Sequence, residues 1–309
     1  MSIQLIPNEI IKATGGRFVA GLGLTMINSV CVDSRKTTPG CLFVPLKGDR
    51  RDGHSFIEDA LNKGAAAALV GSGSGVLGGL KRKDPRKILI EVDDPLTALG
   101  DLAGFWRYKF RPSVVVIAGS GAAHETREMA WNIIRQHYGV LTNSLDGNRL
   151  KELPLSLMKL NAEHKAVLYA MDTFSYAEMK RIAEICNPTV GLVTGTNKQD
   201  RAAMKELLQC LDKDSTAIIN SEHSSSKLLE KSTSARVMTF GLKKGDIRAS
   251  GIRRPKDGQT TFALHVREHA AEVTMALPEG CSVSCALGAA AIASMLGIKI
   301  EDIKEGLEG

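Results

Sequence analysis

The chain has 309 residues, of which 43% are hydrophobic and 24% charged, so it is long enough for two domains and ordinary in composition for a soluble globular protein. Its net charge of +6 is spread along the chain and only 5% of its residues are aromatic, which argues against a nucleic-acid-binding surface. No apolar stretch is long enough to span a membrane, and the N-terminus lacks the apolar core of a signal peptide. The six cysteines show no CxxC spacing, which predicts free thiols in a reducing cytosol.

Residues 1–111 are predicted to form a small α/β domain that ends just before Pro112, because the residue before a proline is disfavoured in a helix. Short β-branched and apolar runs alternate there with stretches of helical periodicity. We expect strands at 30–32, 41–46, 65–70 and 88–92, and helices at 5–14, 56–63 and 95–110.

Residues 112–309 are predicted to form a second α/β domain, in which alternating strands and helices indicate a parallel sheet with helices on both faces. Three segments, 248–252, 260–266 and 272–276, alternate apolar and polar residues around a turn and predict an antiparallel extension of that sheet. The other expected strands are 113–118, 166–171, 190–194, 217–220 and 237–241, and the expected helices are 125–137, 177–186, 201–211, 225–231, 284–296 and 300–307.

The first strand of the second domain runs into a turn of small residues, and a helix follows. Val114 to Ile117 is an unbroken β-branched run, typical of a strand buried on both faces, and residues 118–123 form the turn. Free backbone N–H groups and the positive end of the helix would both face such a turn, which favours phosphate binding. A working P-loop also needs a lysine and an adjacent hydroxyl, but Ala123 and His124 stand in those places.

The start of this helix also carries residues that are common at metal sites. His124 and Glu128 stand four residues apart, but the zinc-protease pattern needs a second histidine where Glu128 stands. Acidic residues such as Glu125 are favourable at the positive end of a helix. We therefore interpret this segment as a solvated helix start and predict no metal site.

Short motifs occur in a fixed order in both domains. They are VDSR at 32–35, LKG at 46–48 and DGHSF at 52–56, followed by ALGAAA at 286–291 and a glycine–leucine pair at 306–307. The first three resemble the UDP-sugar-binding domain of the Mur ligases, and the last two resemble the end of their ATP-binding domain. The likeness is greatest to the type that adds D-alanyl-D-alanine to UDP-N-acetylmuramoyl-tripeptide. The family's third domain would follow Gly309.

The resemblance implies a UDP-sugar ligand, ATP and Mg²⁺. Hydroxyl, guanidinium and ammonium groups suit a nucleotide-sugar diphosphate. The resemblance assigns that ligand to Asp33, Ser34, Arg35, Lys47, Gly48, Asp52, Gly53 and His54. In the alternative interpretation, Asp33 and Arg35 only pair with each other to hold a turn.

The sequence departs from the family at positions where the family performs catalysis. The phosphate lysine falls on Ala123, the magnesium-side threonine on His124, the magnesium-binding glutamate on Ala170 and the carbamylated lysine near Met204. Gly119, Ser120 and Gly121 would then be a vestigial phosphate loop. Because phosphoryl transfer depends on positive charge at the transferred group, we expect neither ATP nor Mg²⁺ to be bound.

These departures favour a Mur-ligase-like pseudoenzyme, a non-catalytic binding or scaffold protein linked to peptidoglycan precursor metabolism in the cytoplasm. It would hold a UDP-N-acetylmuramoyl-peptide-like ligand, or it would dock on a cell-wall, assembly or other protein partner. Two alternatives stay open. One is an active ATP-dependent amide-forming ligase whose site is remodelled or completed by another chain, and the other is a purely structural protein with closed pockets.

Overall fold

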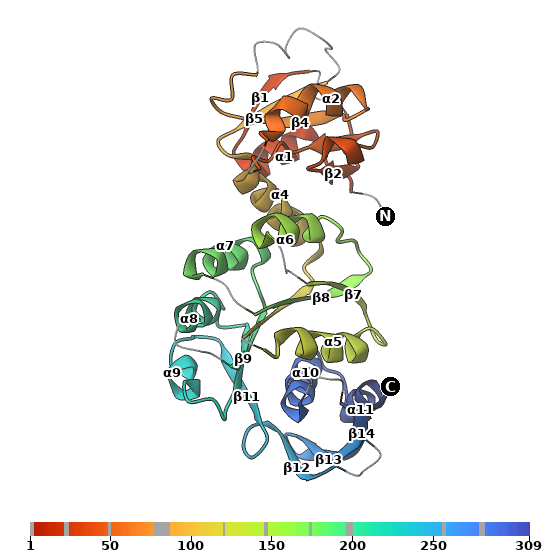
Figure 1. Ribbon diagram of the computed structural model, residues 1–309, viewed down its shortest axis with the longest axis vertical. Coiled ribbons are helices and arrows are strands. Elements are labelled where there is room, and N and C mark those ends of the chain that lie inside the picture. The colour runs from red at the N-terminus through yellow and green to blue at the C-terminus, as the bar shows by residue number, and fades with distance from the viewer. Residues whose placement is uncertain are drawn as a thin grey trace. The chain divides into compact units, whose positions relative to one another are not determined.

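The computed structural model describes residues 3–21, 25–48, 51–76, 87–119, 121–144, 148–172, 175–195, 200–254, 258–277 and 282–309. The chain forms two compact units, both drawn in Figure 1: Met1–Phe110 together with Asn148–Asn161, and Arg111–Gly147 together with Ala162–Gly309. Within the described ranges, no helix combines the length and the apolar character that crossing a membrane requires.

The first unit is built on a five-stranded sheet. Its strands are β1 (Arg17–Ala20), β2 (Ser29–Cys31), β3 (Cys41–Phe43), β4 (Ala67–Gly71) and β5 (Ile88–Val92), in the order β1-β5-β4-β3-β2. Its helices are α1 (Pro7–Thr14), η1 (Ser34–Lys36), η2 (Gly53–Phe56), α2 (Ile57–Asn62), α4 (Pro95–Phe110) and α6 (Arg149–Leu157). Strands β2 to β5 are parallel, and β1 pairs antiparallel with β5. Every residue of β4 and β5 is buried, which explains why β4 is apolar throughout and β5 is apolar except for Glu91. The Glu91 carboxylate accepts a 2.8 Å hydrogen bond from Arg17 Nε of β1.

Residues 148–161 return to the first unit, although they lie beyond the expected boundary at 111/112. Helix α6 packs against α4, and the indole Nε1 of Trp106 donates a 3.1 Å hydrogen bond to the carbonyl oxygen of Leu160. Both residues are buried, so this bond satisfies polar atoms that water does not reach. The first unit is therefore assembled from two separate stretches of chain.

The second unit is built on a nine-stranded sheet. Its strands are β6 (Ser113–Gly119), β7 (Gly139–Ser144), β8 (His164–Met171), β9 (Val190–Gly195), β10 (Thr216–Asn220), β11 (Arg236–Gly241), β12 (Ile247–Arg253), β13 (Gln259–Val266) and β14 (His269–Ala276). Its helices are α5 (Ala123–Ile134), α7 (Tyr176–Cys186), α8 (Arg201–Gln209), α9 (Ser226–Glu230), α10 (Val283–Met295) and α11 (Ile300–Glu308). The sheet order is β14-β13-β12-β11-β10-β9-β6-β8-β7.

Strands β6 to β12 pair in parallel with their neighbours, whereas β12, β13 and β14 pair antiparallel with one another. In Figure 1, α5, α10 and α11 lie on one side of the parallel strands, and α7, α8 and α9 lie on the other. Alternate residues of β13 are buried, as expected for a strand with one covered face. The predicted α/β class, the parallel central sheet and its antiparallel extension are confirmed. Strands β1 and β7 were not predicted.

One glycine of the last helix makes close packing against α5 possible. A Cβ built on Gly306 would lie 2.7 Å from the Cα of Ile133, which is closer than these backbones allow. We expect Gly306→Val to lower the free energy of unfolding by about 2 kcal/mol in urea denaturation, because the two helices would be forced apart. Glu305→Val makes the control change on the exposed side of α11 and should cost no more than about 0.5 kcal/mol. Equal stability of both variants would contradict this packing.

Candidate functional site

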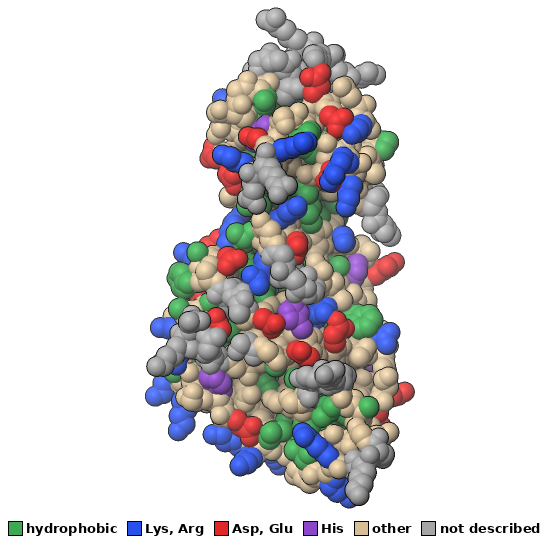
Figure 2. Space-filling model, in the orientation of Figure 1, with side chains coloured by type: hydrophobic (Ala, Val, Ile, Leu, Met, Phe, Trp, Pro, Cys, Tyr) green, Lys and Arg blue, Asp and Glu red, His purple; other side chains and the backbone are tan. Residues whose placement is uncertain are grey.

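Two neighbouring cavities open at the edge of the first unit where the parallel strands end. One has a volume of about 940 Å³ and is lined by Val32, Asp33, Ser34, Arg35, Phe43, Leu46, Gly48, Arg51, Gly53, Phe56 and Lys151. The other, of about 570 Å³, adds Lys47, Asp52, His54 and residues that follow β4 and β5. The structure thus brings together all eight residues assigned to the UDP-sugar. In Figure 2, Lys and Arg side chains are interspersed with acidic ones on the visible face of this unit.

Two further cations line these cavities that the sequence did not single out. Arg51 lies in the same loop as the predicted residues Lys47, Gly48 and Asp52. Lys151 comes from α6, 100 residues further along the chain than Arg51. Nothing local in the sequence indicates that Lys151 returns to this place. Together with Arg35 and Lys47 they give the cavities four cationic side chains, a set that suits a phosphate-bearing ligand.

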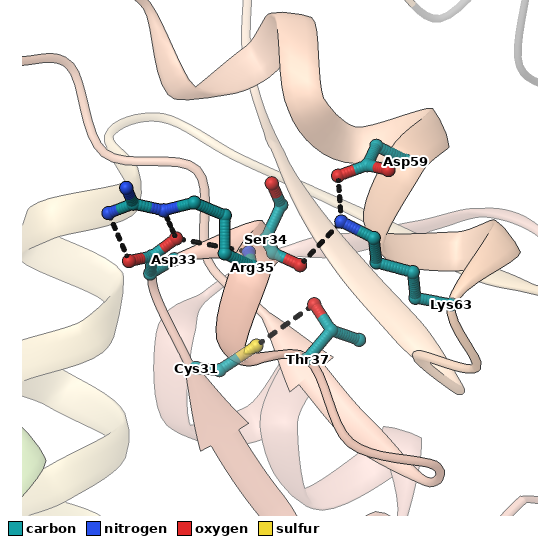
Figure 3. A network of polar contacts seen from close by, with 7 residues as sticks. All are labelled: Cys31, Asp33, Ser34, Arg35, Thr37, Asp59 and Lys63. Atoms are coloured by element: carbon teal, nitrogen blue, oxygen red, sulfur yellow. Dashed lines mark hydrogen bonds and ion pairs between the residues drawn. The ribbon is translucent and has the colours of Figure 1, made fainter.

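Asp33 organises the turn that leaves β2 (Figure 3). Its carboxylate accepts hydrogen bonds from the backbone N–H of Arg35 at 3.0 Å and from Arg35 Nε and Nη2 at 2.9 and 2.7 Å. The Arg35 guanidinium therefore holds the pKa of Asp33 well below its usual range. The Asp33–Arg35 pair that the alternative interpretation expects is therefore present. The paired Arg35 side chain is still 84% exposed and lines the cavity.

Lys63 ties this turn to the neighbouring helix. Its ammonium group donates to the carbonyl oxygen of Ser34 at 3.3 Å and to the carboxylate of Asp59 at 2.8 Å, as Figure 3 shows. Ser34, the first residue of η1, is itself buried, and Lys63 links its carbonyl group to Asp59 of α2. The turn that lines the cavity is consequently fixed from both sides.

His54 anchors the second loop of the cavities to the sheet. Asp52 Oδ1 accepts from the backbone N–H and from Nδ1 of His54, at 2.9 and 2.6 Å, while His54 Nε2 accepts from the backbone N–H of Gly71 at 2.9 Å. The tautomer that satisfies both bonds carries its proton on Nδ1, because Nε2 has to accept. The hydrogen bonds from His54 lower the pKa of Asp52, so the carboxylate stays charged and keeps the ring in place.

The glycine turn of the second unit has a backbone that only glycine adopts easily. Gly119 and Gly121 have φ of +147° and +76°, and a Cβ on Gly119 would lie 2.1 Å from Thr194 Oγ1. Ser120, the middle residue of the predicted loop, lies outside the described residues. Helix α5 begins at Ala123 without a side-chain cap, so the N–H groups of its first turn face the turn unscreened.

Of the four positions that the resemblance aligns with catalytic residues, all but His124 hold apolar side chains that belong to the core. Ala123, Ala170 and Met204 are each 0% exposed. Sequence reasoning missed a carboxylate: Asp172, directly after β8, has its Oδ2 3.5 Å from His124 Nε2. His124 thus pairs across the sheet edge with Asp172, whereas Glu128 pairs with Arg127. The described residues contain no cluster of three metal-binding side chains.

At this edge, backbone N–H groups at the start of α5 suit a nucleotide phosphate, and the carboxylate of Asp172 suits Mg²⁺. Mg²⁺ in nucleotide sites commonly uses one or two carboxylates together with phosphate oxygens and water, so Asp172 meets the minimum requirement. The hydroxyl of Thr194 is buried here and has no hydrogen-bond partner among the described residues.

The fold and the glycine turn define a class: α/β proteins that carry a phosphate-loop-like turn at the carboxyl edge of a parallel sheet. The family is then given by comparison with known sequences. Residues 26–107 match the model described as "Mur ligase family, catalytic domain", and residues 119–293 match the "Mur ligase middle domain". The chain belongs to the Mur ligase family.

The similar relatives share one named activity. UDP-N-acetylmuramoyl-tripeptide–D-alanyl-D-alanine ligases of Buchnera aphidicola (subsp. Baizongia pistaciae) and Escherichia coli K12 are 29% and 27% identical over 91% of this chain. The chain spans 62% and 63% of the length of these two relatives. MurF from Acinetobacter baumannii has the same fold, with a TM-score of 0.87 at 24% identity over 99% of this chain and 68% of that one.

These relatives correct the prediction of a non-catalytic pseudoenzyme. The curated proteins that match 91% of the chain are named as ligases, which favours the alternative of an active enzyme. The prediction assumed that an enzyme without the family's lysine at Ala123 and threonine at His124 is inactive. It also assumed that the glycine turn at 119–121 is a degenerate phosphate loop. The similarity supports neither step. The open cavity beside Arg35 is also at odds with the alternative of closed pockets.

The bonds of His54 make its contribution to stability testable. In His54→Ala the buried N–H of Gly71 loses its acceptor, so the free energy of unfolding should fall by about 1–3 kcal/mol in chemical denaturation. His54→Gln retains an acceptor of similar reach and should recover part of the loss. His137→Ala, at an exposed position, should have little effect. A His54→Ala protein as stable as His137→Ala would show that the bond is dispensable.

The lowered pKa of Asp33 predicts a pH dependence of a definite sign. The folded pKa lies below the unfolded value of about 3.9, so the charged form stabilises the fold above about pH 4 and this stabilisation is lost as the pH falls further. The difference in free energy of unfolding between the wild type and Asp33→Asn should therefore shrink from about pH 4 downward. Arg35→Gln removes the main cause and should abolish most of this effect. A difference that stays constant down to pH 2.5 would contradict the ion pair.

Proposed function

We propose that this chain supplies the UDP-sugar-binding and ATP-binding parts of an ATP-dependent ligase that joins UDP-N-acetylmuramoyl-tripeptide to D-alanyl-D-alanine through an amide bond. The observation that carries this proposal is the similarity, over 91% of the chain, to relatives named for that reaction. A cytosolic location belongs to the same proposal and is supported by the unpaired spacing of the six cysteines.

In the proposed reaction the first unit binds and orients the UDP-linked substrate. Arg35, Arg51 and Lys151 line the larger cavity, so their positive charges suit the diphosphate of the nucleotide sugar. The Asp33–Arg35 pair keeps one of these cations at the cavity rim, and His54 fixes the opposite loop. Preorganised side chains of this kind lower the cost of ordering the site when the substrate binds.

The second unit handles ATP. The carboxylate of the tripeptide takes the terminal phosphoryl group of ATP, and the amine of D-alanyl-D-alanine then displaces phosphate from the acyl phosphate. The N–H groups at the start of α5 and the turn at Gly119 and Gly121 would hold phosphate oxygens. Mg²⁺, when bound, would neutralise the charge that develops on the transferred group.

Asp172 takes the metal-facing role in this remodelled site. It stands two residues beyond Ala170, at the same carboxyl end of β8, where its carboxylate lies next to the start of α5. His124 Nε2 at 3.5 Å orients that carboxylate in place of a threonine hydroxyl.

Phosphate release tests the proposal directly. Release should require ATP, UDP-N-acetylmuramoyl-tripeptide and D-alanyl-D-alanine together, and Asp172→Asn should lower kcat by about tenfold or more because it removes the metal-facing charge. Asp214→Asn, at an exposed position of the same unit, is the matched control and should leave kcat unchanged.

Calorimetry with UDP-N-acetylmuramoyl-tripeptide separates the two units. Arg51→Ala should weaken substrate binding by about tenfold, while Asp172→Asn should leave it unchanged. Tight binding of the UDP-linked substrate without any phosphate release would argue against the ligase. If the protein does not bind UDP-N-acetylmuramoyl-tripeptide at all, the assignment of the first unit as a UDP-sugar-binding unit is wrong as well.

A further inference from the structure

Two thiols face each other beside the larger cavity. Cys31 ends β2 and Cys41 begins β3, and their sulfur atoms lie 3.3 Å apart. Both are free thiols, and both side chains lie on the same face of the sheet, because Ser29 pairs with Cys41 and Cys31 pairs with Phe43. The mechanism proposed above uses neither of them.

The segment between these cysteines carries the turn at the cavity rim. It contains Asp33, Ser34 and Arg35, all of which line the cavity. Strand β2 lies at the edge of its sheet, and no other strand in the described part of the chain pairs with its outer side. The Cys31 sulfur also contacts Thr37 Oγ1 at 3.8 Å, at the other end of the turn (Figure 3). A bond between the two sulfurs would close this turn into a ring.

The surroundings of the pair give one sulfur the character of a thiolate. The hydrogen bond from the Cys31 thiol lowers the pKa of Cys41 to about 7, and the Lys87 ammonium group acts in the same direction. The same hydrogen bond raises the pKa of Cys31, which stays protonated. Cys41 is buried, and Cys31 is half-buried at the sheet edge. A thiolate next to a second thiol is the arrangement of a redox-sensitive pair, and peroxide reaches the buried Cys41 when the edge strand β2 moves away from β3.

We infer that Cys31 and Cys41 form a reversible disulfide that closes the segment between them and restrains the Asp33–Arg35 turn. A peroxide of the size of hydrogen peroxide is the oxidant. The Cys41 thiolate attacks one peroxide oxygen and forms a sulfenic acid with it. The O–O bond breaks, and the other oxygen departs as hydroxide, which is protonated to water. The Cys31 sulfur then attacks the sulfenic sulfur, and its proton leaves with the hydroxyl group as a second water. Two thiols are oxidised and one peroxide is reduced to two waters.

Bond formation changes the shape of the cavity rim. The two sulfurs have to move from 3.3 Å to about 2.05 Å, which draws the end of β2 toward β3. Val32 and Phe43, which directly follow and oppose Cys31, both line the cavity and would be brought closer together. This part of the inference rests on the proposed UDP-sugar site. There the disulfide should weaken binding of the UDP-linked substrate.

Mass spectrometry of the intact chain tests bond formation without reference to function. Treatment with one equivalent of hydrogen peroxide should remove two hydrogens from the mass and give a Cys31–Cys41 cross-linked peptide, which dithiothreitol reverses. Cys31→Ser should prevent both changes, and Cys186→Ser, at another free thiol, should prevent neither. Because Cys41 is buried, the half-buried Cys31 is the position to substitute first. Absence of the cross-linked peptide would overturn the inference.

The rate of amide hydrogen exchange measures how strongly the disulfide restrains the turn, and it needs no ligand. The N–H groups of Arg35 and Lys36 donate to Asp33 at 3.0 and 2.9 Å and exchange only when the turn opens. Their exchange should be slower in the oxidised protein and unchanged by peroxide in Cys31→Ser. Equal exchange rates in both redox states would show that the bond restrains nothing.

Binding of UDP-N-acetylmuramoyl-tripeptide completes the test. Oxidation should weaken it by roughly threefold or more, and dithiothreitol should restore it. If the reduced protein does not bind this substrate, the proposed function fails, while the peptide and exchange results still decide the thiol pair. If the reduced and oxidised proteins bind it equally, the link between the disulfide and the cavity is wrong.

Discussion

Parallel pairing of strands is the constraint on which both units depend. In a parallel sheet all carboxyl ends lie at one edge, so the segments that leave the strands meet there. In the first unit the cavities are lined by residues that follow β2 to β5, such as Asp33, Lys47 and Asp93. In the second unit the glycine turn ends β6 and Asp172 follows β8 at the corresponding edge. Residues distant in sequence thereby become neighbours without any long loop.

The fold class was predictable because burial on both faces leaves an unambiguous pattern. The β-branched run of β6 and the apolar strand β4 are buried on both faces, so no polar residue interrupts either pattern. The two strands that were missed lack this pattern. Strand β1 is short and largely exposed, and β7, at the edge of its sheet, has the mixed sequence GVLTNS. Their places depend on partners that local periodicity does not reveal.

The candidate site was only partly predictable, for two different reasons. Its loop residues follow strands and carry recognisable motifs, so the group from Asp33 to His54 could be gathered from the sequence. Lys151 could not, because it reaches the cavity through the return of α6. In the second unit, the resemblance only predicted that the family's catalytic side chains are missing at Ala123 and Ala170. It did not show that Asp172 stands beside His124, since that pairing joins two segments only in the folded chain.

The return of residues 148–161 to the first unit has a consequence for how the protein is made. The ribosome releases the chain from the N-terminus, and domains generally fold as units in that order. Here the first unit lacks the carbonyl of Leu160, which Trp106 needs, until β6, α5 and β7 of the other unit have already emerged. During translation of this stretch the first unit is therefore incomplete. Until α6 has emerged, the surface of α4 that it covers is exposed, and a chaperone could bind there.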